Sequence, residues 1–241
     1  MSTVEAALAP PDGDLPPASW LLSGGCDAAG RVPLPPDGVL EELARVGRIN
    51  WHAGLADPGA IRRAARYVDR ISFDFVGSDE TIARVLGIDA RVEDYLATYR
   101  RLRAAAPVVP HVVVGLDGGR IRGEGRALDI LAAEEAPSLV LLVLWPAPGT
   151  AFAGLSPPPL GDVFEIFARA RRRLPAAELA LGCMRPPGSY RAALDLVAAG
   201  LGFDVIVQPT HPVVRAVGNG ADSFEECCAF ALGGEGRGAE T

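Results

Sequence analysis

Seven short apolar segments recur along the chain, and each is followed by an amphipathic segment. The apolar segments are Trp20–Ser23, Ile49–His52, Ile71–Phe75, Val108–Leu116, Leu139–Leu144, Leu179–Gly182 and Val205–Val207. Helical periodicity follows them over Gly38–Val46, Pro58–Val68, Asp79–Val85, Val92–Ala105, Gly123–Glu135, Leu160–Leu174, Ser189–Ala199 and Pro212–Val217. Apolar strands that alternate with helices are typical of a parallel sheet covered by helices. The sequence therefore predicts an α/β fold.

The number of strand–helix units decides which α/β fold is expected. A TIM-type (β/α) barrel has eight units, and this chain supplies seven. We therefore predict an incomplete barrel over residues 19–230 that lacks its first unit. Residues 1–18 are rich in Pro and Ala and predict a flexible arm, and the Gly-rich, acidic residues 231–241 predict a disordered tail.

Composition excludes several classes of function. A net charge of −7 and a pI near 5.0 argue against nucleic-acid binding, which needs clustered basic residues. All 23 basic residues are Arg, which rules out Schiff-base catalysis and a P-loop lysine. The longest apolar run, Leu139–Trp145, is too short to span a bilayer, and no secretory signal opens the chain. We expect a cytoplasmic protein whose four cysteines are buried thiols or metal ligands rather than disulfides.

Polar and reactive side chains gather where the predicted strands end, which is where α/β folds place their chemistry. They are Cys26, Asn50, His52, Asp74, Cys183 and His211, with His111 inside the fourth strand. Taken alone, His111 and Asp74 are each better explained as hydrogen-bonded structural residues. Their recurrence at one end of the predicted barrel favours a site, because polar groups inside strands are costly unless they are satisfied.

Two glycine-rich turns follow predicted strands. Ser23-Gly24-Gly25-Cys26 closes the first, where backbone N–H groups can approach a ligand beside a free thiol. The second turn, Gly115–Glu124, can cradle an anion or support a flat ring. The adjacent Cys227 and Cys228 are about equally well explained as a buried thiol pair or as metal ligands.

In this order and spacing, the chain resembles the radical-SAM superfamily, and in particular its biotin synthase-like and lipoyl synthase-like members. The resemblance runs from about Trp20 to Phe230. It is carried by Leu21–Asp27 with Gly30–Leu34, Asn50–Leu55, Ser72–Gly77, Pro110-His111, Gly119–Glu124, Leu181–Pro186 and Cys227–Phe230.

The resemblance implies cofactors and site residues. Ser23, Gly24 and Gly25 would hold the amino group of S-adenosylmethionine (SAM), and Gly119, Ile121 and Gly123 would pack on its adenine. Side chains that would face SAM or substrate are those of Asn50, His52 and Asp74. The implied activity is SAM-dependent C–H activation, with sulfur insertion as one variant, on a small-molecule or lipoyl- or biotin-type substrate.

One family feature is missing. The CxxxCxxC loop that binds the SAM-cleaving [4Fe–4S] cluster precedes the glycine motif in the family, and no cysteine precedes Cys26 here. Three explanations stay open. The chain is one part of a split enzyme whose partner chain supplies the missing strand and cluster, or a cluster-free, non-catalytic binding subunit, or a shortened form of a longer gene product.

Two metal hypotheses follow. Cys26, Cys183 and one of Cys227 and Cys228 would bind an auxiliary Fe–S cluster at the barrel mouth. Alternatively, His52, Asp74 and His111 would hold the metal ion of a barrel hydrolase or lyase, provided that the three side chains converge.

Overall fold

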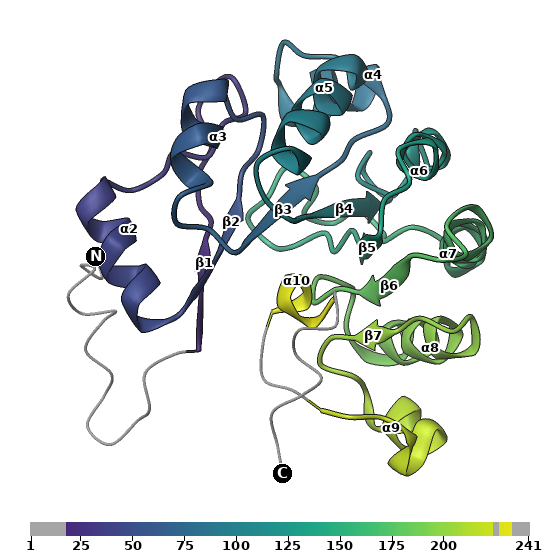
Figure 1. The fold of residues 1–241 in the computed structure, drawn as a ribbon. Coiled ribbons are helices and arrows are strands. Elements are labelled where there is room, and N and C mark those ends of the chain that lie inside the picture. Colours follow the sequence, from purple (N-terminus) through teal and green to yellow (C-terminus); the bar gives the residue numbers. More distant parts are fainter. Residues whose placement is uncertain (1–17, 224–226, 233–241) are drawn as a thin grey trace. The chain divides into compact units, whose positions relative to one another are not determined.

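A computed structural model describes residues 18–223 and 227–232 of the chain (Figure 1). The chain divides into two compact units. The first contains residues up to 73 together with 97–108, and the second contains 74–96 together with 109 onward. Apart from Ala18, the predicted N-terminal arm lies outside the described residues.

The first unit is built on three parallel strands, β1 (Ser19–Leu22), β2 (Arg48–His52) and β3 (Arg70–Asp74). Helix α2 (Asp37–Val46) connects β1 to β2, and α3 (Pro58–Ala64) connects β2 to β3. The Asp57 side chain accepts hydrogen bonds from the N–H groups of Gly59 and Ala60, so it caps α3 as an N-cap residue does. Trp51 and Ile71, which are paired across β2 and β3, are both fully buried and form the centre of this unit.

The second unit contains four parallel strands and most of the helices. The strands are β4 (Val108–Val114), β5 (Ser138–Val143), β6 (Glu178–Leu181) and β7 (Val205–Ile206). The helices are α4 (Asp79–Thr81), η1 (Ile82–Leu86), α5 (Val92–Arg103, which continues into the first unit), α6 (Glu124–Ala133), α7 (Leu160–Arg173), α8 (Gly188–Gly200), α9 (His211–Val217), η2 (Gly218–Gly220) and α10 (Cys228–Ala231).

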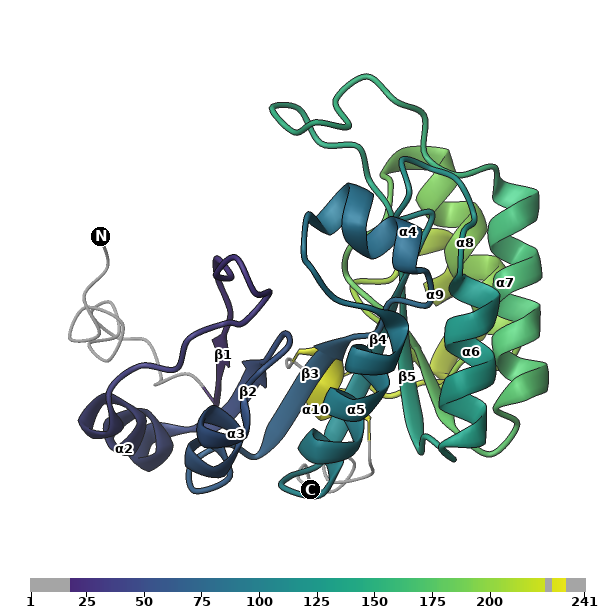
Figure 2. The same cartoon turned by 90° about the horizontal axis from the view of Figure 1, so that it is seen from above.

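Helices α6, α7 and α8 lie side by side along one face of β4–β7 (Figures 1 and 2). Helix α7 shows why. Its buried residues Val163, Ile166, Phe167 and Ala170 follow the spacing of one helical face, and its charged residues take the other. Every residue of β5 is buried, as expected for a strand that is covered on both faces.

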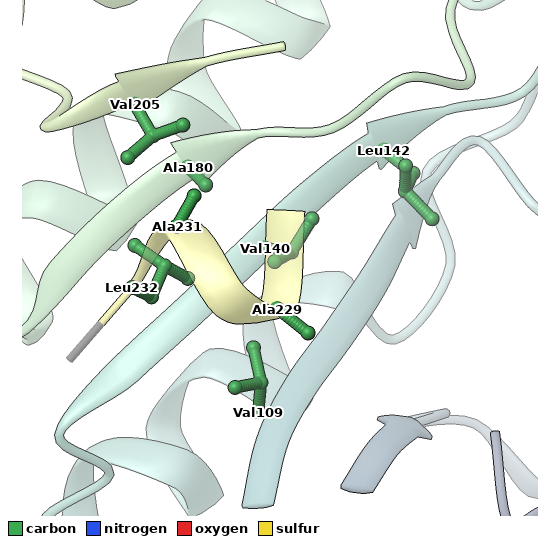
Figure 3. Close-up of a cluster of buried hydrophobic side chains, with 8 residues drawn as sticks. All are labelled: Val109, Val140, Leu142, Ala180, Val205, Ala229, Ala231 and Leu232. Atoms are coloured by element: carbon green, nitrogen blue, oxygen red, sulfur yellow. The ribbon is translucent and has the colours of Figure 1, made fainter. Parts of the chain in front are cut away.

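The opposite face of β4–β7 is covered by α10 (Figure 3). Ala229, Ala231 and Leu232 pack against side chains of the four strands, among them Val109, Val140, Leu142, Ala180 and Val205. The chain's own C-terminal helix thus completes the core on this face. Ala231 and Leu232, which open the predicted tail, are buried, and residues 233–241 lie outside the described part.

The predicted fold class is confirmed. The structure is α/β, with seven parallel strands in sequence order. Each strand is followed by at least one helix of seven or more residues, which is the connectivity of a partial TIM-type barrel. No helix in the described ranges has both the length and the hydropathy that crossing a bilayer requires.

Several element boundaries differ from the predictions. The helix expected over Asp79–Val85 is a single α-helical turn that continues as the π-helix η1. Strand β4 ends at Val114 rather than Leu116, because Gly115 turns the backbone to a φ of 79°. Helix α3 ends at Ala64 rather than Val68.

Candidate functional site

The segment after β1 has an open backbone. Residues Ser23 to Ala29 are all exposed, and no atom of the described residues lies within 4 Å of the position that a Cβ would take on Gly24 or on Gly25. Gly24 has a φ of 150°, whereas Gly25 needs no left-handed conformation. The Cys26 thiol is free and exposed beside them. The backbone of this segment therefore lies at the surface, and its binding of a ligand stays a prediction.

The base of this segment is fixed. Asp27 Oδ1 accepts hydrogen bonds from the N–H groups of Ala29 (2.9 Å) and Arg31 (3.0 Å). Leu55 N–H donates to the Gly30 carbonyl at 2.9 Å, which ties the loop after β1 to the loop after β2. Only the glycine end next to β1 is therefore left open.

Asn50 and His52 are spaced by two residues on β2, so they lie on one face of that strand. Asn50 is buried, and its amide Nδ2 donates to Ser72 Oγ at 3.0 Å. His52 is half-buried and stands opposite Ser72 in the strand register. The Asn50–Ser72 contact stabilises the pairing of β2 and β3. A role for Asn50 and His52 toward SAM or substrate stays a prediction.

In the second unit, the turn that carries the predicted adenine motif is closed by the protein itself. A Cβ on Gly119 would stand 2.6 Å from the Ser156 carbonyl oxygen, and a Cβ on Gly123 would stand 2.6 Å from Ser78 Cβ. Both glycines have positive φ, 89° and 96°. Their missing side chains thus make room for neighbouring chain segments, while Ile121 between them is half-buried.

A buried carboxylate organises the same turn. Asp117 receives hydrogen bonds from the guanidinium groups of Arg84 on the π-helix η1 and of Arg122, the latter at 2.8 Å. Burial would raise the pKa of the Asp117 carboxyl, but the hydrogen bonds and charges of Arg84 and Arg122 outweigh it and lower that pKa. Asp117 is therefore ionised and serves as a structural anchor.

Glu124 closes the turn from the other side. Its carboxylate accepts hydrogen bonds from the N–H groups of Gly115 (2.8 Å) and Arg122 (2.5 Å). Burial raises the pKa of Glu124, although these backbone hydrogen bonds act in the opposite direction.

Asp74, at the end of β3, is half-buried.

His111 forms a pair with Cys228. The His111 Nδ1–H donates to the Val109 carbonyl at 2.9 Å, and His111 Nε2 lies 3.6 Å from Cys228 Sγ. Burial raises the pKa of the Cys228 thiol to about 12, and the neighbouring Cys227 and Cys183 add to that effect. Cys228 is thus a protonated thiol in contact with the imidazole of His111.

The four cysteines are distributed over both units. Cys26 belongs to the first unit, and Cys183, Cys227 and Cys228 belong to the second. Among the described residues, no three or more His, Cys, Asp or Glu side chains are arranged to hold a metal ion. These residues therefore do not fit a cluster as they stand, and the auxiliary Fe–S cluster stays a prediction. The same holds for the metal triad of His52, Asp74 and His111.

Sequence reasoning missed a buried ion pair at the ends of β6 and β7. Arg185 and Asp195 are both fully buried and lie 2.9 Å apart, Nε to Oδ1. Arg185 also donates to the carbonyls of Gly182 and Val207, and Asp195 accepts the N–H of Thr210. The sequence signal that could have indicated it is Asp195, an acidic residue on the apolar face of the helix predicted over Ser189–Ala199. This pair fixes the loops after both strands.

Comparisons with known proteins show similarity at the level of the fold. No protein-family model and no curated protein sequence matches the chain. HydG, a maturase of the [FeFe]-hydrogenase, is similar with a TM-score of 0.55 at 14% identity, over 70% of this chain and 40% of HydG. The chain thus shares part of its fold with HydG.

Two further solved structures are similar at lower scores. Methylornithine synthase (PylB) has a TM-score of 0.49 at 15% identity, and a glucosidase from Croceicoccus marinus has 0.39 at 13% identity. Both alignments cover 70% of this chain, with 48% of the first and 44% of the second. The chain therefore spans less than half the length of each of the three structures.

Proposed function

We propose that this chain is the SAM-binding part of a radical-SAM-type enzyme of the biotin and lipoyl synthase kind, and that a partner chain supplies the SAM-cleaving cluster. The observation that carries the proposal is the open backbone at Gly24 and Gly25, which follows the first strand of a fold similar to that of HydG. Main-chain groups of exposed glycines can receive the amino and carboxylate groups of an amino-acid-type ligand.

The contrast with the second glycine turn supports this assignment. Gly119 and Gly123 are covered by neighbouring segments, and the closed turn is held by Asp117 and Glu124. Gly24 and Gly25 have no neighbour of that kind within residues 18–223 and 227–232. The φ of 150° accounts for glycine at position 24, whereas Gly25 has neither a positive φ nor a covering neighbour among the described residues that would require glycine.

The residues of this chain would hold SAM through the Ser23–Gly25 backbone. Bound SAM, together with a reduced [4Fe–4S] cluster, supplies C–H activation in the family that the sequence resembles. The described residues offer no cluster ligand set, so this chain's own part is to bind and orient SAM. Within the proposal, the cluster ligands come from the partner.

Equilibrium dialysis with radiolabelled SAM under anaerobic conditions tests the binding site. We expect saturable SAM binding by the wild-type chain. Binding by Gly25→Val should be at least about tenfold weaker, which is a loss of at least about 1.4 kcal/mol of binding free energy. Gly25 has open space and no positive φ, so added bulk blocks a ligand without straining the fold. Gly38→Val is the matched control, since Gly38 is also exposed, unrestricted and in the first unit.

Iron and sulfide analysis after anaerobic reconstitution tests the split arrangement. Iron bound only when a neighbouring gene product is present supports a partner-supplied cluster. SAM binding with no iron in either preparation identifies a cluster-free binding subunit instead. Failure of the wild-type chain to bind SAM, alone or with the partner, overturns the proposal.

A further inference from the structure

Helices α6 and α7 share a charged cavity in the second unit. The cavity has a volume of about 390 Å³ and is lined by Asp129 on α6 and by Arg169, Arg172 and Arg173 on α7. The two helices are neighbours in the layer that covers β4–β7 (Figures 1 and 2). We propose that this cavity binds a compact, phosphate-bearing anion.

The three arginines gather at the cavity because of their spacing. Arg169, Arg172 and Arg173 follow one another at i, i+3 and i+4, so they lie on one side of α7. The side chains of Arg169 and Arg173 are 43% and 52% exposed, and Arg172 is exposed as well. A ligand from solution can therefore reach all three guanidinium groups.

One carboxylate holds two of these groups in place. Arg169 Nη2 donates to Asp129 Oδ2 at 2.7 Å, and Arg173 Nε lies 2.8 Å from Asp129 Oδ1. A guanidinium group has five N–H donors, so both arginines keep donors for a further acceptor. Asp129 thus fixes two guanidinium groups beside the cavity without using up their hydrogen-bonding capacity.

A glycine on α6 makes room for one of the arginines. A Cβ on Gly125 would stand 2.9 Å from Nη1 and 3.1 Å from Cζ of Arg169. Gly125 lies in the first turn of α6 without a positive φ, and glycine disfavours a helix relative to alanine. The position of the Arg169 guanidinium group explains why a glycine is nevertheless suitable here.

Positive charge is in excess around the cavity. The other arginines of the two helices have carboxylate partners, since Arg126 is paired with Glu93 and Arg171 with Asp204. Arg172 has no hydrogen bond or ion pair with any residue of the described ranges. Like charges three or four positions apart destabilise a helix, so an anion bound here would relieve their repulsion. Guanidinium groups match phosphate well, because they donate two parallel hydrogen bonds to it.

Size and lining define the class of ligand. The volume lies in the range of about 300–1,000 Å³ that small-molecule sites occupy, but such sites are mostly apolar and every lining residue here is charged. A compact anion such as pyrophosphate or a small phosphate ester fits this lining. The net charge of −7 argues against a nucleic acid as the source of the phosphate.

This site goes beyond the proposed function. It lies in the second unit, whereas the proposed SAM contacts of Ser23–Gly25 belong to the first. The competing explanation is a surface ion-pair cluster that only joins α6 to α7 and binds no ligand.

Isothermal titration calorimetry of the full chain with pyrophosphate, in about 0.15 M NaCl, tests the proposal. We expect saturable binding of one equivalent by the wild-type chain. Arg172→Ala should bind about tenfold more weakly or worse, since it removes charge-assisted hydrogen bonds to the anion. It should fold normally, because Arg172 is exposed and unpaired within the described residues. Arg215→Ala, at an exposed arginine of α9 outside the cavity, is the matched control and should bind within twofold of wild type.

Three further probes identify the chemistry of the ligand. Tighter binding of glycerol 3-phosphate than of inorganic phosphate assigns the site to a phosphorylated small molecule, and the reverse order assigns it to free phosphate or pyrophosphate. Citrate, a carboxylate anion of similar charge, should bind more weakly than pyrophosphate. Tighter binding of citrate, absence of binding of every phosphate probe by the wild-type chain, or unchanged binding in Arg172→Ala overturns the proposal.

Discussion

The carbonyl oxygen of Gly123 lies so close to the position that a Cβ atom on Gly77 would take that the two atoms would clash. The same Cβ would stand 2.6 Å from the backbone nitrogen of Ala127, inside the first turn of α6. Main chain thus packs directly on main chain where the segment after β3 crosses the start of α6. Gly77 is buried, so neither side has room to yield.

Replacing Gly77 by Ala should therefore destabilise the second unit. The methyl group has to displace backbone rather than a flexible side chain, and overpacking of this kind typically costs about 1–3 kcal/mol. Urea unfolding monitored by circular dichroism measures the effect as a lower midpoint with an unchanged slope.

Gly161→Ala is the control for the Gly77 variant. Gly161 lies in the first turn of α7, is exposed and has open space around its Cβ position. Ala is favoured over Gly in a helix by about 1 kcal/mol at most, so this variant should unfold at the same or a higher urea concentration. Equal destabilisation by both substitutions would contradict the packing argument.

The glycine turns show what the sequence could predict and what it could not. The order of residues predicted both turns and their place after strands, because that information is local. It did not indicate which turn would be open, since the covering atoms near Gly119 and Gly123 come from Ser156 and Ser78, in other segments. Occupancy of such a space depends on tertiary packing, which a single sequence does not reveal.

Asp117 anchors two arginines, and its replacement by Asn should cost stability at neutral pH. Arg84 and Arg122 keep side-chain exposures of 50% and 37%, so losing the carboxylate does not leave a charge buried. The expected loss is that of charge-assisted hydrogen bonds, about 1.5–3 kcal/mol. Chemical denaturation at pH 7 measures it.

The pH dependence checks the cause. The pKa of Asp117 is lower in the folded chain than in the unfolded chain, so its stabilisation is complete above the unfolded pKa of about 3.9. It is lost as the pH falls through the lower, folded pKa. The difference in unfolding free energy between wild type and Asp117→Asn should therefore shrink in this acidic range. A difference that stays constant from pH 7 to pH 3 would show that shape, rather than charge, explains the effect.

The Arg185–Asp195 ion pair should be costly to break from one side. Both side chains are fully buried, so Asp195→Ala leaves a guanidinium without its carboxylate, at an expected cost of about 3–5 kcal/mol. The double variant Arg185→Met with Asp195→Ala should lose less than the sum of the single variants. A double-mutant cycle from urea unfolding measures this coupling, and additive losses would contradict it.

The buried contacts of the second unit were beyond prediction from the sequence for one physical reason. His111 and Cys228 are separated by 117 positions, and they meet because α10 docks on the strands. The strand pattern predicted that His111 lies in a buried strand, which is confirmed. The pattern did not indicate where the four-residue helix α10 would pack on the strands.

The docking of α10 predicts how the cysteines react. In the native chain, Cys26 and Cys183 are exposed and should be alkylated rapidly by iodoacetamide, whereas Cys228 should be protected by burial. Ala229→Asp places a carboxylate against the buried strand surface and should undock α10, so that Cys228 reacts about as fast as Cys26. Val214→Asp, at an exposed position on α9, should leave Cys228 protected. Mass spectrometry of pulse-labelled peptides gives each rate separately. Rapid labelling of Cys228 in the wild-type chain would show that α10 does not cover the sheet in solution.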